Sequence, residues 1–97
     1  MTRNATVNLN SHVARSEEVL ASEVDGEVVM ININQGAYSG LNNVGSEIWR
    51  LLESPMKVSD ICDKMEGRYN VDRQACEKDV LTFLNDLASD NIIRVLD

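Results

Sequence analysis

The chain has 97 residues, of which 43% are hydrophobic and 4% aromatic. This length is typical of one domain with a small core built mainly from aliphatic side chains. The formal net charge of -7 argues against nucleic acid or an anionic membrane surface as the partner, because both are bound through Lys and Arg. It favours a neutral or basic partner.

The composition does not indicate secretion, membrane insertion or metal binding. No apolar run is long enough to cross a bilayer, and the N-terminus lacks a signal-peptide pattern, so we expect a cytoplasmic protein. Cys62 and Cys76 fall on the apolar faces of predicted helices, which favours buried reduced thiols. A zinc site needs more ligands, and the only histidine is His12. We therefore expect no metal and no cofactor.

Residues 1–11 are polar and rich in Asn, which predicts a flexible arm before a domain at 12–97. The alternation of Val7 and Leu9 with polar neighbours leaves a weak extra strand open within this arm.

Three short strands are predicted next. Glu18–Val24 and Glu27–Ile33 flank Asp25-Gly26, a dipeptide typical of a two-residue hairpin turn. Both faces of the second strand carry apolar residues, so we place it in the centre of a three-stranded antiparallel meander. The third strand, Ala37–Leu41, is short and directly precedes a helix, which favours a position at the sheet edge. Backbone groups at an edge are free to pair with another chain.

Apolar residues at helical spacing predict three helices after the meander. Asn42 or Asn43 can cap the first helix, Gly67 is placed as the stop of the second, and Asp72 can cap the third. The fold class is therefore α+β, a three-stranded antiparallel meander followed by three helices. The predicted helices are Val44–Glu53, Val58–Met65 and Arg73–Ser89, with a final extended segment at Ile92–Leu96.

The third helix has a broad apolar face. Leu81 and Ala88 widen its main stripe to an arc of roughly 160°, whereas one packed neighbour needs only about 100°. Either the helix touches two neighbours in the core, or one margin of the arc lines a groove. In the second case Leu81 and Ala88 should be more exposed than Val80 and Leu87. The side chains expected in the core include Ile48, Trp49, Leu52 and Phe83.

No catalytic constellation is present in the sequence. It has no Gly-rich phosphate loop and no Ser-His-Asp set. Gly45-Ser46-Glu47 could suggest a phosphopantetheine-bearing serine at a helix start, but the usual Asp-Ser-Leu motif is absent. We therefore expect a protein that is not an enzyme.

Short motifs follow one another in a fixed order at the predicted junctions. They are Asp25-Gly26-Glu27, Gly36 to Asn42, Gly45 to Trp49, Leu51-Leu52, Asp79-Val80, Phe83-Leu84 and Leu87. Together they resemble the PqqD family, over about Val13 to Leu96. Members of this family are also called RiPP recognition elements, small winged-helix-like domains that bind leader peptides of ribosomally made natural products. Lys57 departs from the Ser or Thr that often caps the second helix of the family, and Asn91 departs from a Gly.

The resemblance implies that a leader peptide adds as a strand beside the third strand, in a cleft between that strand and the third helix. It implies a stand-alone, non-catalytic protein that presents the precursor to maturation enzymes. These are the leader peptidase and cyclase of a lasso-peptide pathway, which we favour slightly, or a radical-SAM enzyme. The implied peptide-binding residues are Ala37, Tyr38, Ser39, Gly40 and Leu41 at the edge, with Val80, Leu81, Leu84 and Ala88 on the helix.

Two other classes remain open from the sequence. Three helices and a terminal strand also fit a winged-helix DNA-binding domain, although the third helix carries more carboxylates than cations. A purely structural subunit of an enzyme complex, without a peptide site, is the other alternative.

Overall fold

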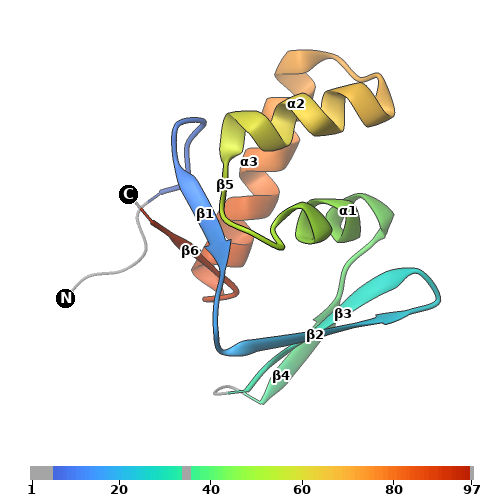
Figure 1. Ribbon diagram of the computed structural model, residues 1–97, viewed down its shortest axis with the longest axis vertical. Coiled ribbons are helices and arrows are strands. Elements are labelled where there is room, and N and C mark those ends of the chain that lie inside the picture. Colours follow the sequence, from blue (N-terminus) through green and yellow to red (C-terminus); the bar gives the residue numbers. More distant parts are fainter. Residues whose placement is uncertain (1–5, 34–35, 97) are drawn as a thin grey trace.

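The computed structural model describes residues 6–33 and 36–96. Within them the chain forms two small antiparallel sheets of three strands each, together with three helices (Figure 1). The radius of gyration is 12.9 Å, as expected of one domain of this length. The α+β class predicted from the sequence is confirmed.

The first sheet is the predicted meander. Its strands are β2 (Val19–Val24), β3 (Glu27–Asn32) and β4 (Ala37–Gly40), in the order β2-β3-β4. The turn between β2 and β3 has φ 54° at Asp25 and 84° at Gly26, so both central residues take the positive φ that a type I′ hairpin needs. The strand order confirms the central position of β3 and the edge position of β4.

The second sheet was not predicted. It consists of β1 (His12–Arg15), β5 (Met56–Lys57) and β6 (Ile93–Val95), in the order β5-β1-β6. The sequence predicted no strand at β1 and only an extended segment at β6. These strands are short and come from distant parts of the chain, so no local turn signal announces their pairing.

Two of the three helices lie close to their predicted bounds. α1 (Asn43–Leu51) is capped by the Asn42 side chain, whose Oδ1 accepts from the Gly45 N–H at 2.8 Å. α3 (Arg73–Ser89) has the predicted bounds and is capped by Asp72.

The remaining helix, α2 (Val58–Tyr69), is longer than predicted, and the stop assigned to Gly67 is wrong. The helix continues through Gly67 and ends at Asn70, which adopts the left-handed conformation at φ 53°. Asn tolerates this conformation better than most residues, so it can end a helix as glycine does.

The core lies between the two sheets and the helices. Ile48, Trp49 and Leu52 are buried as expected, whereas Phe83 is only partly buried, contrary to the prediction. The meander packs one face against α1 through Val28 and Met30. Because side chains alternate along a strand, the opposite face of the meander points away from α1.

A buried serine joins α1 to the meander. The Ser46 Oγ accepts from the Val28 N–H at 2.9 Å and donates to the Leu41 carbonyl at 3.2 Å. The hydroxyl therefore bridges the Val28 N–H and the Leu41 carbonyl, and it fixes the position at which β4 turns into α1.

The segment before β1 packs on α3. Val7 is buried, and its N–H donates to Asn85 Oδ1 at 2.9 Å while Asn85 Nδ2 donates to the Val7 carbonyl at 3.2 Å. No strand forms in residues 6–11. The remainder of the predicted arm, residues 1–5, lies outside the described residues.

The cap of α1 gives a first prediction. Asn42→Ala should lower the free energy of unfolding by about 1 kcal/mol, because the Gly45 N–H loses its acceptor. Asn43→Ala is the matched control, since Asn43 is exposed and is the first helical residue rather than the cap. Urea denaturation of both variants measures the difference, and an equal loss in both would contradict the cap assignment.

Candidate functional site: an open strand edge beside an apolar groove

The edge of β4 carries backbone groups without a strand partner among the described residues. β4 pairs with β3 in the register Met30↔Ser39 and Val29↔Gly40. The Leu41 N–H donates to the Val28 carbonyl at 2.8 Å. Because N–H groups alternate in direction along a strand, the Ser39 N–H points toward β3 and the Gly40 N–H points outward. The same alternation turns the Tyr38 N–H outward.

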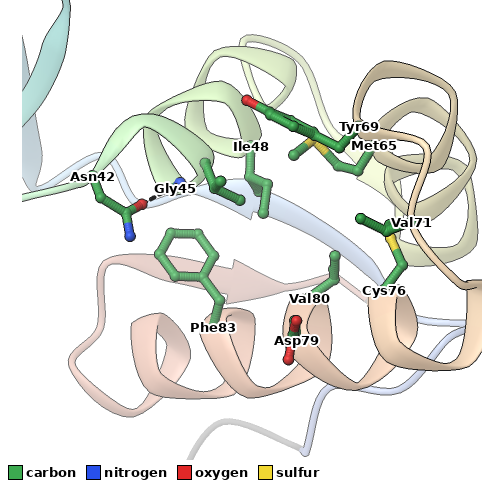
Figure 2. A pocket seen from close by; sticks show the side chains of 11 residues that line it. Asn42, Gly45, Ile48, Met65, Tyr69, Val71, Cys76, Asp79, Val80 and Phe83 are labelled. Carbon is green, nitrogen blue, oxygen red and sulfur yellow. Dashed lines mark hydrogen bonds between the residues drawn. The ribbon is translucent and has the colours of Figure 1, made fainter.

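A groove of about 330 Å³ opens next to the point where β4 ends and α1 begins. Its walls come from the start of α1, the end of α2 and one side of α3 (Figure 2). Asp79 is its only charged lining residue among those described. The groove is lined by Asn42, Val44, Gly45, Ile48, Met65, Tyr69, Val71, Cys76, Asp79, Val80 and Phe83.

Large apolar side chains are exposed around this groove. Val44, Tyr69 and Val71 have 46%, 40% and 43% of their surface accessible. Water-exposed apolar side chains that converge on one concavity are typical of a binding site.

Gly45 permits the close approach of α1 and Phe83. A Cβ atom at this position would lie 3.1 Å from the Phe83 ring and 3.3 Å from the Asn42 side chain. Figure 2 shows the ring beside Gly45 and Asn42, on the groove side of α3. The absence of a side chain at Gly45 therefore sets the width of the groove at the end nearest β4.

The structure places the sequence-predicted helix residues in different surroundings. Val80 lines the groove, whereas Leu84 and Ala88 are 0% and 3% exposed within the core. Leu81 is partly buried, and the Asn85 side chain that binds Val7 also donates to the Leu81 carbonyl at 2.9 Å. Of the four α3 residues that the resemblance implied, Val80 therefore lines this groove, whereas Leu84 and Ala88 lie in the core.

The expected difference in exposure holds for Leu81 but is wrong for Ala88, which is as buried as Val80. The broad arc of α3 has a structural explanation at each margin. One margin contacts the N-terminal segment through Asn85, and the other borders the groove through Asp79 and Phe83. The assignment of individual residues to peptide binding stays a prediction.

Sequence reasoning missed most of the groove-lining residues. Tyr69 and Val71 lie beyond the end predicted for α2, and the helical stripe had assigned Phe83 to the core. Val44 was predicted only as the first residue of the first helix, and nearly half of its surface is exposed. Apolar residues at the margins of helical stripes were the available signal.

The two thiols are suited to packing rather than to chemistry. Burial raises the pKa of Cys62 to about 11 and also raises the pKa of Cys76, so both thiols stay protonated at neutral pH. The Cys76 Sγ donates weakly to the Cys62 carbonyl at 3.8 Å. Within the described residues, no group of three His, Cys, Asp or Glu side chains is arranged to hold a metal ion.

An ion-pair network fixes the β2–β3 hairpin against α1. The Arg50 guanidinium binds Glu23 at 3.0 Å, the Gly26 carbonyl at 2.8 Å and Glu47 at 3.1 Å. The hydrogen bond and the positive charge that Arg50 presents to Glu23 lower the pKa of this carboxyl, which stays ionised and tied to Arg50. The network orients the meander, and hence β4, relative to the helices.

Comparison with known proteins places these features in a family. A family model described as Coenzyme PQQ synthesis protein D (PqqD) matches residues 27–93. A comparison with curated proteins finds no match. In the described part of the chain, none of the helices combines the length and apolar character needed to cross a membrane.

Two solved structures are similar to this chain. One is TbiB1 in complex with the TbiA(beta) leader peptide, with 38% identity and a TM-score of 0.78 over 82% of this chain and 93% of that one. The other is a lasso peptide synthetase B1 complexed with the leader peptide, with 22% identity and a TM-score of 0.74 over 84% of this chain and 95% of that one. The second likeness concerns the fold alone. Since the family model covers more than half of the sequence, the chain belongs to the PqqD family.

Proposed function

We propose that the protein is a non-catalytic recognition protein that binds the leader of a ribosomally made precursor peptide and presents it to maturation enzymes. The observation that carries this proposal is the open edge of β4 beside an apolar groove. The relative with 38% identity is described as a complex with a leader peptide, which supports the same role here.

The leader adds as an antiparallel strand to β4. The outward backbone groups of Tyr38 and Gly40 supply main-chain hydrogen bonds that do not depend on the leader sequence. Apolar leader side chains enter the groove between α1 and α3 and supply specificity. This division between backbone bonds and side-chain pockets is the usual basis of recognition by strand addition.

A lasso-peptide pathway is favoured over a radical-SAM pathway. One of the two similar solved structures is named a lasso peptide synthetase B1, and its likeness to this chain is one of fold. The partners are then a leader peptidase and a cyclase. A cytoplasmic location is supported by the two cysteines, which are unpaired and buried.

The DNA-binding alternative is not favoured by the electrostatics of α3. The Arg73 guanidinium is held by Asp63 at 2.6 Å, Glu77 at 2.7 Å and Glu66 at 3.1 Å. A cation surrounded by three carboxylates has little remaining attraction for a phosphate, and the chain carries a net charge of -7.

The proposed function is tested by titrating a labelled leader into the purified protein. The first probe is the TbiA(beta) leader, which is bound by the relative with 38% identity. The second is the leader of any precursor peptide identified in the genome that encodes this chain. We expect saturable binding at one site and slower hydrogen exchange at the Tyr38 and Gly40 amides, with little change at Ser39, whose N–H is already paired. No binding of either leader would overturn the proposal.

The groove gives a second prediction. Phe83→Ala should raise the leader Kd at least tenfold, or about 1.4 kcal/mol. Its effect on folding should be smaller than the roughly 3–5 kcal/mol of a fully buried Phe, because the ring is only partly buried. Leu81→Ala is the control, since Leu81 is also partly buried but lies on the opposite margin of α3. If Leu81→Ala weakens binding and Phe83→Ala does not, the leader uses the other margin.

A further inference from the structure

The face of the meander that points away from α1 is apolar and uncovered. We define this outer face by Leu20 and Val24 on β2, Val29 and Ile31 on β3, and Ile33. Leu20, Val24, Ile31 and Ile33 have 59%, 55%, 44% and 56% of their surface exposed. Leu20 lies directly opposite Ile31 in the β2–β3 register, so their side chains share one face.

No described element covers the outer face. In Figure 1, α1 lies on the other side of the meander, against which Val28 and Met30 are buried. Of the other exposed large apolar side chains, Val44, Tyr69 and Val71 line the groove between the helices, and Leu96 follows β6 of the other sheet. A contiguous apolar patch of this kind is typical of a protein–protein interface.

The ionisable residues that strand alternation places on the outer face, Glu18 and Glu27, are both acidic. The Ile33 N–H donates to the Glu18 carbonyl at 3.0 Å, which places Glu18 opposite Ile33 at one end of the face. Glu27 lies opposite Val24 at the other end. The sequence contains no Lys or Arg between Arg15 and Arg50. Arg50 lies at the hairpin end, where it binds Glu23 and the Gly26 carbonyl, and Arg94 lines a small hollow together with Glu18. The strands of the outer face therefore supply an apolar centre with acidic ends and no Lys or Arg.

These charges indicate which kind of protein can bind the outer face. In a symmetric pair the acidic ends of two copies would lie close together, which disfavours a second copy as the occupant. A different protein with an apolar patch bordered by Lys or Arg would meet both the centre and the ends.

We propose that the outer face docks the maturation enzyme through such a basic-bordered apolar surface. The proposal rests on the proposed leader-binding function. β4 belongs to the same sheet, so an enzyme seated on the outer face lies beside the strand that the leader adds to. The docking face and the leader site are thus adjacent but use different residues.

The test uses the full chain and a purified leader peptidase identified in the genome that encodes this chain. The double variant Leu20→Thr/Ile31→Thr removes apolar surface while keeping residues that favour strands. We expect its affinity for the peptidase to fall at least tenfold, with unchanged leader affinity and melting temperature. Leu96→Thr is the control, because Leu96 is 45% exposed but lies at the other sheet. It should bind the peptidase normally.

A second variant tests the charges. Glu18→Gln/Glu27→Gln should slow association with the peptidase and flatten the dependence of the association rate on salt concentration.

Normal peptidase affinity in both double variants, or no peptidase binding by the unaltered protein, would overturn the docking proposal. A stable dimer that the Thr variant converts to monomer would instead assign the face to a second copy and also overturn it. Failure of the unaltered protein to bind a leader would overturn the proposed function, and it is measured separately.

Discussion

Ser39→Pro is expected to destabilise the fold, whereas Gly40→Pro is expected to leave it folded and weaken leader binding. The Ser39 N–H points toward β3, so proline at this position removes a ladder bond and places its ring against the neighbouring strand. The loss should be about 1–3 kcal/mol, the cost of leaving a buried acceptor unpaired.

The Gly40 N–H points outward, so its removal costs the folded protein no ladder bond. Gly40 does not have a positive φ, and a Cβ atom there would meet nothing within 4 Å, so the proline ring has room. Loss of one main-chain bond to the leader should raise its Kd about five- to tenfold, or roughly 1–1.4 kcal/mol.

Gly40→Ala is the matched control, because it adds a side chain but keeps the N–H. Thermal melts and leader titrations of the three variants separate the two effects. If Gly40→Pro binds the leader as tightly as Gly40→Ala does, the leader does not pair with β4. If Ser39→Pro melts normally, the hydrogen-bond direction assigned to this strand is wrong.

Leu84→Ala should lower the free energy of unfolding by about 2–5 kcal/mol, which is a large part of the stability of a domain of this size. Leu84 is 0% exposed and lies in the core, so the truncation leaves a cavity that the surroundings fill only in part. The resemblance had implied a role for Leu84 at the peptide site, and any loss of binding should follow from the loss of folding.

Leu96→Ala is the control, because this side chain is 45% exposed and should change stability by less than about 0.5 kcal/mol. Urea denaturation measures both variants, and leader titration at a temperature where both are folded measures binding. A folded Leu84→Ala protein with normal stability and strongly weakened leader binding would place Leu84 in the peptide site.

The sequence by itself determined the features that depend on neighbouring residues. Asp25-Gly26 sets the β2–β3 hairpin, Asp72 sets the start of α3, and apolar spacing sets its length, because turns, caps and helical periodicity are local. The edge position of β4 also follows from the sequence, since three consecutive short strands most simply form a meander. The family resemblance rests on these same local motifs.

Only the tertiary structure decided how the elements meet. β1, β5 and β6 form a sheet because segments from the two ends and the middle of the chain come together, which no local pattern encodes. A helical stripe shows which residues face inward but not which neighbour they contact, so the groove margin with Phe83 could not be told from the margin with Leu81. Likewise, alternation separates the N–H groups of Ser39 and Gly40 into two sets. The register with β3 decides which set stays open to a partner, because hydrogen-bond direction depends on the paired strand.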